Sequence, residues 1–363
     1  MSLRKMQVLY RKYRPRAFEE IEGQEHIVRT LQGALASENV GHAYLFCGPR
    51  GTGKTTMARL LAKSLNCGKY QKRAEGQLQN IPCNSCHSCS EINEGRSLDL
   101  IEIDAASNRG IDEIRNLKDS ARVAAAGGGR KIFIVDECHM LTKEANNALL
   151  KLLEEPPQHV FFVLATTEPY KIPDTILSRV QRLDFKKISP EQIKNKLTGI
   201  AKKEKININE PALVQLANSA SGSLRDAESA FSKVIAYAGQ GKAINLETVT
   251  EILGIVPLQV HDALINLILS KNAQEAISQI NDLHEAGIDL NNFLKQFIRH
   301  LRAKLIGMIG EKSYVVVASA TPGQATPDVL INMLNVFMRA ANEIKLSPVP
   351  QLPIELAILE LTK

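Results

Sequence analysis

The sequence predicts an α/β domain with a parallel sheet and an inserted metal-binding module, followed by two helical domains. Three observations predict this class. Apolar runs typical of buried strands alternate with helical patterns up to about residue 187. A glycine-rich phosphate loop joins the first of these strands to a helix. Only helical patterns follow, so we expect domains over 1–187, 188–254 and 255–363.

Composition excludes several classes of protein. The chain has 363 residues, too many for one ordinary core, and its 44% hydrophobic and 23% charged residues are typical of a soluble globular protein. No apolar run approaches the roughly 20 residues of a membrane span, and the N-terminus lacks the apolar centre of a secretory signal. The net charge of +6 permits a polyanionic partner without requiring one. We expect a cytoplasmic protein with no membrane partner.

The N-terminal segment Leu9–Pro15 combines basic and aromatic residues. So close to a phosphate loop, it can close over a nucleotide base, or it can form a surface arm with half-buried tyrosines. The residues alone do not separate these alternatives. An amphipathic helix is predicted next over His26–Ala36.

The segment Gly48–Thr55 fits the phosphate-loop pattern. The predicted strand His42–Cys47 precedes it and a helical pattern from Thr56 follows, which is the context that such a loop requires. Glycines let successive N–H groups point at one anion, and the helix N-terminus adds its positive dipole end. Lys54 is expected to reach the β- and γ-phosphates, and the Thr55 hydroxyl to hold Mg²⁺. The nucleotide-binding residues predicted here are Gly48, Pro49, Gly51, Thr52, Gly53, Lys54, Thr55 and Thr56.

Four of the six cysteines are expected to form a metal site. Three of them are separated by two residues each, a spacing that can wrap one tetrahedral ion, and the fourth lies upstream. Four thiolates suit a closed, structural Zn²⁺ site in a reducing compartment, in a module over about residues 67–89. The alternatives are unliganded surface thiols, or His87 in place of one cysteine. The expected ligands are Cys67, Cys83, Cys86 and Cys89.

Two acidic residues, Asp136 and Glu137, follow the strand predicted over Lys131–Val135. A magnesium–nucleotide site needs carboxylates opposite its phosphate loop. Asp136 would orient the Mg²⁺ shell and Glu137 would polarise an attacking water. The alternative is a pair of exposed acids at a strand end.

Further strands and helices complete the α/β domain. A hydroxyl of Thr166 or Thr167 would lie at the carboxyl end of a strand, where ligands of open α/β sheets gather. The predicted strands are Leu98–Asp104 and Val160–Ala165, and the predicted helices are Ile111–Ala121, Ala145–Leu153 and Pro173–Arg179.

The helical region contains one further candidate. Ser223 and Asp226 are spaced as a capping box, which puts Arg225 in the first turn of a helix, where a guanidinium can point at phosphate. The alternative is an exposed helix arginine. Gly254–Pro257 is predicted to form a hinge before four or five long helices. The natural role of these helices is assembly, and the alternative is a plain helical domain whose apolar stripes fill its own core. The chain stops inside a helical pattern, so we expect this sequence to be part of a longer chain.

These motifs, taken in order, resemble the AAA+ clamp-loader ATPases, and more closely the gamma/tau subunits of bacterial DNA polymerase III. The resemblance covers residues 7 to about 250 strongly and the last third by helical layout alone. The zinc cluster inside such a domain is its most specific element. The segments that carry it are Tyr10–Pro15, Gly48–Thr56, the four cysteines, Asp104–Asn108, Val135–Leu141, Leu152–Pro157, Ala165–Thr167, Ile176–Arg179 and Gly222–Asp226.

The resemblance implies roles for individual residues. Thr167 looks like the first sensor, Arg225 like a second sensor on a lid domain over 188–254, and Arg179 like an arginine finger that enters a neighbouring subunit's site. The catalytic set implied is Lys54, Asp136, Glu137, Thr167, Arg179 and Arg225, with Tyr10, Arg14, Pro15, Gly23 and Gln24 near the adenine.

The resemblance also implies partners. The last domain would form the collar of a pentamer with the delta and delta prime subunits, and the assembly would use ATP to load the sliding clamp onto primer–template DNA. The resemblance also makes Arg109, Lys143 and Lys151 candidates for phosphate contacts with DNA.

Three other classes of function compete with this one. The sequence Asp136–His139 matches a helicase box, but we find no second motor domain. A branch-migration AAA+ motor would not need the cysteine cluster. A non-catalytic scaffold subunit of the loader usually has a damaged phosphate loop, whereas Lys54 and Thr55 are present here with Asp136 and Glu137.

Overall fold

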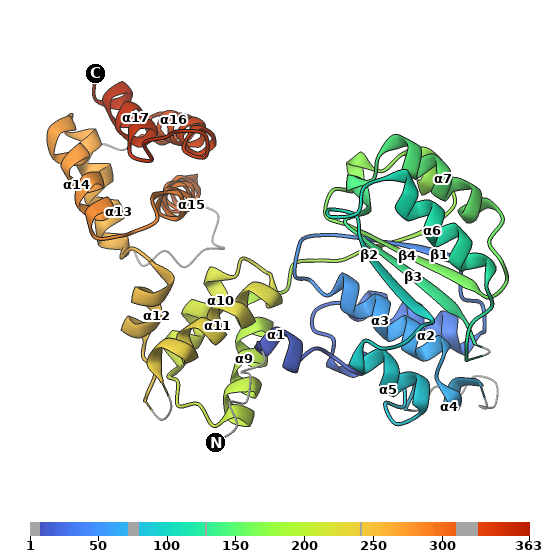
Figure 1. The fold of residues 1–363 in the computed structure, drawn as a ribbon. Coiled ribbons are helices and arrows are strands. Elements are labelled where there is room, and N and C mark those ends of the chain that lie inside the picture. The colour runs from blue at the N-terminus through green and yellow to red at the C-terminus, as the bar shows by residue number, and fades with distance from the viewer. Residues whose placement is uncertain (1–7, 72–79, 128, 240–241, 310–325) are drawn as a thin grey trace. The chain divides into compact units, whose positions relative to one another are not determined.

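A computed structural model describes residues 8–71, 80–127, 129–239, 242–309 and 326–363. The chain forms two compact units, Met1–Asn245 and Leu246–Lys363, whose elements are labelled in Figure 1. Residues 72–79 of the predicted metal module lie outside the described residues.

In the described part of the first unit, five strands form a parallel sheet in the order β2–β3–β4–β1–β5. This confirms the predicted fold class, and the first four strands lie where apolar runs predict them. The sequence pattern does not predict β5, since Leu183 is its one apolar residue. The strands are β1 (Ala43–Cys47), β2 (Leu100–Asp104), β3 (Lys131–Asp136), β4 (Val160–Thr166) and β5 (Gln181–Asp184).

Helices cover both faces of the sheet (Figure 1). Neighbouring residues of β1 serve different faces, because side chains alternate along a strand: Leu45 belongs to one core and Phe46 to the other. Burial on both faces explains why β1, β3 and β4 are almost continuously apolar. One face is covered by α2 (Glu25–Ala36) and α3 (Lys54–Leu65), the other by α6 (Ile111–Arg122), α7 (Lys143–Glu154) and α8 (Asp174–Leu177).

A helical lobe of α9, α10 and α11 completes the first unit. Each helix is capped by a side chain that accepts a hydrogen bond from a backbone N–H of its first turn: Ser189 caps α9, Asn209 caps α10 and Ser223 caps α11. Ser189 forms a full capping box with Gln192. The short helix α1 packs on α11, and Leu9 N donates to Ser232 Oγ at 3.3 Å. The bounds are α1 (Leu9–Lys12), α4 (Gly68–Gln71), α5 (His87–Glu94), α9 (Pro190–Glu204), α10 (Glu210–Ser219), α11 (Leu224–Ala238), and 3₁₀ turns at Phe18–Glu20, Cys138–Met140 and Pro169–Lys171.

The second unit is helical throughout its described residues. Its core gathers the apolar stripe of α15 (Leu290, Phe293, Leu294, Phe297 and Leu301) against α13, α14, α16 and α17. The predicted hinge Gly254–Pro257 joins α12 to α13 and lies within this unit. The helices are α12 (Leu246–Leu253), α13 (Leu258–Leu269), α14 (Ala273–Glu285), α15 (Leu290–Ile309), α16 (Pro327–Glu343) and α17 (Leu352–Thr362).

Among the described residues, no single helix is long and apolar enough to cross a membrane. Helices α12 and α13 reach the length and apolar composition of a membrane span only as a pair, and a bend of 55° separates them.

Candidate functional site

The glycines of the phosphate loop are required by its backbone. Gly48 has φ +145°, and a Cβ there would lie 2.5 Å from the carbonyl oxygen of Phe185. Gly51 has φ +75°, and a Cβ there would lie 2.0 Å from Ser223 Oγ of the helical lobe. A side chain at either position would therefore push β5 or the lobe away from the loop.

Lys54 is buried at the start of α3. Its ammonium donates to the carbonyl oxygens of Gly48 at 2.7 Å and Pro49 at 2.9 Å. Burial lowers the pKa of Lys54, and the carboxylates of Glu137 and Asp136 oppose that shift. The loop thus holds a desolvated cation at its centre, which is what a polyphosphate needs.

Thr55 and Asp136 meet although they are far apart in sequence. The Thr55 hydroxyl donates to Asp136 Oδ2 at 2.7 Å. Because β3 and β1 end at the same edge of a parallel sheet, the carboxylate arrives beside the loop. A hydroxyl and a carboxylate together are oxygen ligands that Mg²⁺ prefers.

The neighbouring acid, Glu137, is held by the end of β4. Its backbone is left-handed, with φ +48°. Its Oε2 accepts from Thr167 Oγ1 at 2.9 Å and from Thr167 N at 3.3 Å. The adjacent hydroxyl of Thr166 is buried and lies 3.0 Å from His139 Nδ1. Of the two threonines, Thr167 is thus the one that contacts Glu137.

The helical lobe closes on the loop through the start of α11. Leu224 N donates to the carbonyl oxygen of Gly51 at 3.1 Å. Arg225 stacks over the ring of Tyr10, with Cζ 5.0 Å from the ring centroid. The capping arrangement predicted at Ser223 is present, since its Oγ accepts from Asp226 N at 3.2 Å.

A pocket joins these parts. It is lined by Arg50–Thr56 of the loop, by Asp136 and Glu137, by the arm residues Tyr10, Arg14 and Pro15 with Ile21 and Glu22, and by Ile188, Leu224, Arg225 and Glu228 toward the lobe. The basic-aromatic arm therefore borders the pocket with Arg14 and Pro15. Gly48 and Pro49 do not line the pocket, and their carbonyl oxygens accept hydrogen bonds from Lys54 instead.

Glu228 is a pocket residue that the sequence analysis did not single out. It is 5% exposed, and burial raises its pKa to about 7. The sequence could have indicated this position, because Glu228 lies next to Ala227 and three residues before Phe231 on the apolar face of an amphipathic helix.

Gly23 and Gln24, predicted near the base, do not line the pocket. Gln24 is fully buried, and its amide pairs with the backbone of Lys186, donating to its carbonyl at 2.7 Å and accepting from its N–H at 3.1 Å. The amide of Gln24 is thus committed to the segment that leads into the lobe, and it is not free to contact a base.

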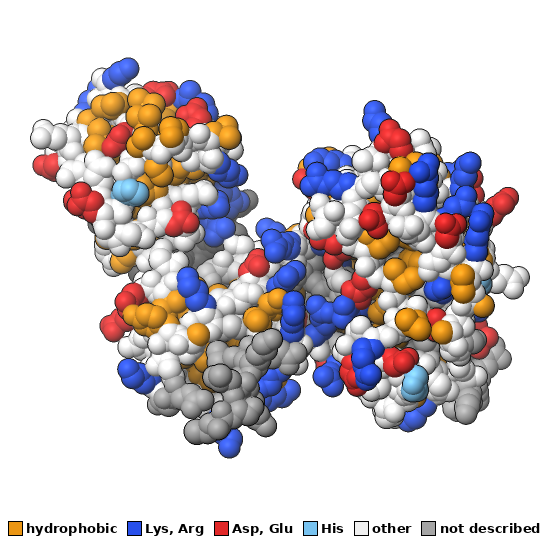
Figure 2. All heavy atoms as spheres, in the orientation of Figure 1, with side chains coloured by type: hydrophobic (Ala, Val, Ile, Leu, Met, Phe, Trp, Pro, Cys, Tyr) orange, Lys and Arg blue, Asp and Glu red, His pale blue; other side chains and the backbone are white. Residues whose placement is uncertain are grey.

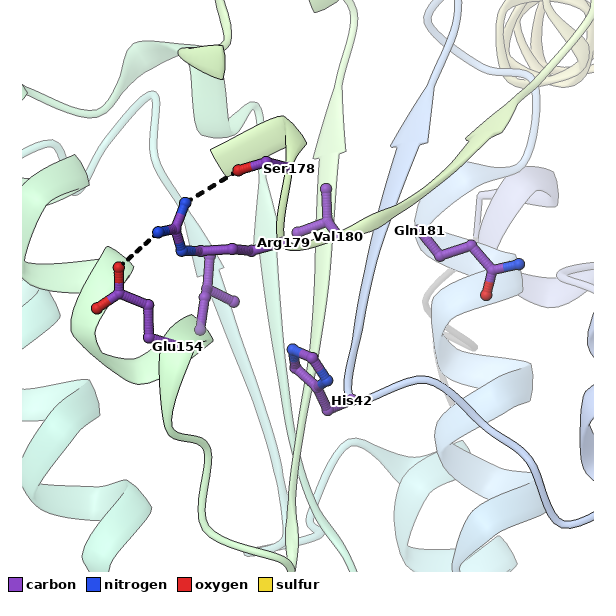
Figure 3. Close-up of a pocket in the computed structure, with 7 residues that line it drawn as sticks. His42, Glu154, Ser178, Arg179, Val180 and Gln181 are labelled. Carbon is purple, nitrogen blue, oxygen red and sulfur yellow. Dashed lines mark hydrogen bonds and ion pairs between the residues drawn. The ribbon is translucent and has the colours of Figure 1, made fainter. Parts of the chain in front are cut away.

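Arg179 lies away from this pocket, at the end of α8 (Figure 3). Its guanidinium pairs with Glu154 Oε1 at 2.7 Å, and donates to the Thr175 carbonyl at 2.7 Å and Ser178 Oγ at 2.9 Å. It lines a shallow surface recess with His42 and Gln181. Arg179 therefore makes no contact with the phosphate loop of its own chain.

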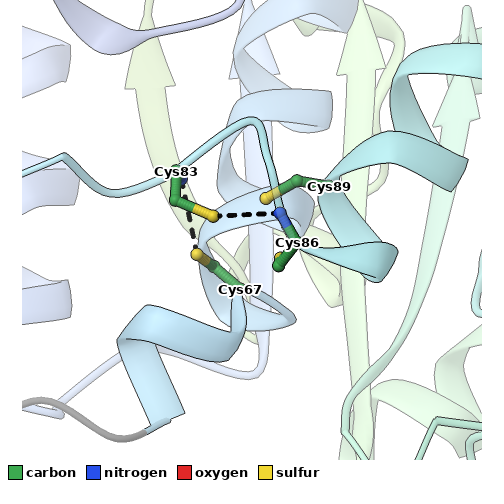
Figure 4. Close-up of side chains that lie close together, drawn as sticks. All are labelled: Cys67, Cys83, Cys86 and Cys89. Carbon is green, nitrogen blue, oxygen red and sulfur yellow. Dashed lines mark hydrogen bonds between the residues drawn. The ribbon is translucent and has the colours of Figure 1, made fainter.

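The four predicted cysteines come together (Figure 4). Their sulfur atoms all lie within 4.8 Å of one another, a spacing that suits tetrahedral thiolate ligands of Zn²⁺. The N–H of Cys83 donates to Cys67 Sγ at 3.4 Å. A hydrogen bond from the Cys89 thiol lowers the pKa of Cys67, and smaller contributions in the same direction come from hydrogen bonds of backbone N–H groups. His87 has an 87% exposed side chain facing Glu91, so it is not the alternative ligand.

Two of the three DNA candidates lie together. Thr142 N donates to the carbonyl of Arg109, which brings Arg109 beside Lys143 at the N-terminus of α7. Both side chains are exposed. Lys151 lies in the last turn of α7, at the opposite end of that helix.

Three family models cover most of the chain. "DNA polymerase III, delta subunit" matches residues 23–189, "DNA polymerase III clamp loader subunit, ATPase lid domain" matches residues 192–240, and "DNA polymerase III subunits gamma and tau domain III" matches residues 244–363.

Curated relatives agree with the family models. The chain is 38% identical to DNA polymerase III subunit tau of Bacillus subtilis over 98% of its length and 42% identical to that of Escherichia coli over 80%. It spans 63% and 44% of those two proteins, respectively. It is 40% identical to DNA polymerase III subunit gamma of Buchnera aphidicola, covering 81% of this chain and 79% of that protein.

Solved structures support the fold. The structure of a single-residue variant of Thermotoga maritima RuvB matches with a TM-score of 0.50 at 17% identity, covering 80% of this chain and 91% of that one, a likeness in fold alone. With the family models, the relatives, a complete phosphate loop and its paired carboxylate all in agreement, the chain belongs to the AAA+ clamp-loader family of DNA polymerase III gamma and tau subunits.

Proposed function

We propose that this protein is the ATP-driven motor subunit of a bacterial sliding-clamp loader, which uses ATP hydrolysis to load the clamp onto primed DNA. The observation that carries the proposal is the complete magnesium–nucleotide constellation: Lys54 at the centre of the loop, and Thr55 bonded to Asp136. This constellation argues against a scaffold subunit.

In this proposal the residues of one chain bind ATP and prepare its hydrolysis. Lys54 exchanges its bonds with loop carbonyls for bonds to the β- and γ-phosphates. Mg²⁺, held at Thr55 and Asp136, neutralises charge on the phosphates when bound. Glu137 exchanges its hydrogen bond with Thr167 for one with the attacking water, which it polarises. Thr167 acts as the first sensor. Arg225 exchanges its stack on Tyr10 for a phosphate contact, as second sensor.

Hydrolysis is completed by Arg179 of a neighbouring subunit. The support is that Arg179 does not line the pocket of its own phosphate loop, together with its half-buried position at a surface recess. Its pairing with Glu154 keeps the guanidinium ordered until a neighbour's γ-phosphate competes for it. ATP turnover then depends on assembly.

The helices of the last domain supply the assembly surface. Leu352, Leu356 and Leu359 form an exposed apolar stripe along α17, and Figure 2 shows hydrophobic side chains gathered over α16 and α17. Such a patch favours a protein interface. The partners we propose are the delta and delta prime subunits in a pentamer, the sliding clamp, and primer–template DNA at Arg109, Lys143 and, less centrally, Lys151.

We assign residues 1–187 to the nucleotide-binding domain, with Zn²⁺ on its four cysteines, 188–245 to the lid and 246–363 to the collar, which moves α12 out of the lid that the sequence predicts over 188–254. The first compact unit ends at Asn245, which favours counting α12 with the collar. We place the protein in the bacterial cytoplasm, where thiols stay reduced.

The test is ATP turnover by a loader reconstituted with this chain. We expect turnover that rises when the clamp and primed DNA are both present, and that is abolished by Lys54→Ala. If the clamp does not change the rate of ATP turnover and the protein instead unwinds duplexes or drives branch migration, it is another AAA+ DNA motor. No turnover in a loader that still loads clamps would indicate a scaffold subunit.

A further inference from the structure

A buried lysine joins the cysteine module to the N-terminal arm. Lys63 lies on α3, the helix that begins at Lys54, and is 2% exposed. Its ammonium donates to the carbonyl oxygen of Arg16 at 3.0 Å, to Asn93 Oδ1 at 2.8 Å, and to Asn84 Oδ1. A buried cation is costly unless its donors are paired, so these acceptors have to stay in place.

Asn84 contributes a second bond to the same carbonyl. It lies between Cys83 and Cys86 in a left-handed backbone conformation, with φ +58°. Its Nδ2 donates to the carbonyl oxygen of Arg16 at 3.1 Å. The side chain thus reaches out of the cysteine loop and holds the arm, while its oxygen receives Lys63.

The held segment is the one that borders the nucleotide pocket. Arg14 and Pro15 line that pocket and directly precede Arg16. On the other side of Arg16, Phe18 is 2% exposed within the core under α2 and α3. The arm is thus fixed just beyond the pocket by one apolar anchor and by two donors to a single carbonyl.

We propose that Lys63 and Asn84 couple the cysteine module to the N-terminal arm, so that an intact module positions Arg14 and Pro15 for nucleotide. The coupling gives the module a task beyond its own stability: it sets how firmly the arm closes one side of the pocket. Its consequence for nucleotide affinity rests on the function proposed above, whereas its consequence for the order of the arm does not.

The sharpest variant is Asn84→Asp. It keeps the acceptor for Lys63 and the tolerance for a left-handed backbone, but it loses the N–H donor to Arg16. Asn80→Asp is the matched control, because Asn80 has φ +57° in the same loop and is exposed. Zinc content, measured by elemental analysis under reducing conditions, verifies that each variant retains its metal.

Two measurements on the full chain test the coupling. Hydrogen exchange without nucleotide reports on the backbone of residues 8–16, and titration with a fluorescent ATP analogue reports on affinity. For Asn84→Asp we expect arm exchange about 3- to 10-fold faster and affinity lower by a similar factor, the effect of losing the one hydrogen bond that Asn84 donates to the arm. Removal of zinc from the wild type should speed arm exchange likewise, and zinc should restore it.

The coupling is overturned if arm exchange in Asn84→Asp and in the zinc-free chain matches the wild type, or if Asn80→Asp changes it equally. Faster arm exchange with unchanged affinity would remove the nucleotide part of the inference. A wild-type chain that binds no ATP analogue would count against the proposed function, while arm exchange would still decide the coupling.

Discussion

The two compact units bury different kinds of side chain. Among the described residues, the first unit buries four charged side chains, those of Lys54, Lys63, Lys131 and Glu228. In the described part of the second unit, His261 is the one buried polar residue. Each of the three lysines donates hydrogen bonds to nearby oxygens. Of these buried charged residues, Lys54 and Glu228 line the nucleotide pocket.

The second unit does the reverse. Its interior is apolar and aromatic, with Phe297 packed edge-on against Phe337, and it leaves apolar side chains such as Leu356 and Met338 more than half exposed. Unpaired apolar surface is a feature of a protein that assembles. From this difference we infer that one unit is suited to a charged ligand and the other to contact with protein, and each prediction below tests one side of that inference.

The largest effect is expected at Arg179. In a loader in which this chain carries Arg179→Ala, ATP hydrolysis should fall by about 10³–10⁵-fold, because the charge on the transferring phosphoryl loses its partner. ATP affinity should stay near the wild-type value, since Arg179 does not line its own chain's pocket. Steady-state turnover and equilibrium binding measure the two quantities.

Glu154→Gln is the matched control for the finger, because it removes the ion pair of Arg179 and keeps the arginine. We expect its hydrolysis rate to stay at the wild-type level or above it. A loss of ATP affinity in Arg179→Ala chains studied alone would show that Arg179 acts in its own chain's site.

The next effect concerns the cysteine cluster. Cys67→Ser should lose zinc, and with free zinc at about a thousand times the dissociation constant, loss of the site lowers the free energy of unfolding by about 4 kcal/mol. Elemental analysis and unfolding with and without zinc measure this. His87→Gln should retain its zinc. Zinc near zero in the wild type would refute the metal assignment.

The local parts of the site could be predicted from sequence. Gly48–Thr55 and the three closely spaced cysteines are encoded in a few consecutive residues, and a buried strand delivers Asp136 to the sheet edge where the loop lies. Fixed spacing and strand order therefore suffice to place the phosphate loop, the pair of Thr55 and Asp136, and the cysteine cluster.

Contacts between distant segments could not be predicted. Nothing in the sequence near Gln24 indicates that its amide pairs with Lys186, or that Lys63 binds the carbonyl of Arg16. Glu228 enters the pocket only because the lobe folds over the loop. β5 has no apolar pattern and forms because β1 offers it an edge. Tertiary packing decides each of these.

A smaller effect is expected on the apolar surface of α17. Leu356 is 53% exposed, so Leu356→Glu should leave the chain folded while weakening assembly about 30-fold or more, the effect of a buried interface position. Sedimentation of the reconstituted loader measures assembly. Val123→Glu, at a position 62% exposed on the first unit, is the control and should assemble normally. Normal assembly of Leu356→Glu together with Leu359→Glu would contradict this role.

The smallest effect is the pH dependence of the second unit. His261 is 1% exposed against Phe293, beside His300 and Asp262, and burial lowers its pKa to about 4. The unfolded chain binds a proton near pH 6.5, so the stability from a neutral His261 is complete above that pH and falls as the pH drops toward 4. At pH 5 the loss is about 2 kcal/mol.

His261→Leu should remove this loss, because leucine has no proton to gain and the unpaired Nδ1 of His261 disappears. Hydrogen exchange of α13 and α15 at pH 5.0 and 7.5, corrected for intrinsic rates, gives the local free energy of unfolding. The wild type should lose about 2 kcal/mol more than His261→Leu between the two pH values, and the exposed His284→Gln should behave as wild type. An equal loss in His261→Leu would mean that the acid sensitivity of this apolar unit comes from another group such as Asp262, which is largely buried and whose pKa is lowered by its hydrogen bonds to His300 and Lys304. The two units would then differ only in which side chains they bury, and the burial of His261 would not lower the free energy of unfolding at low pH.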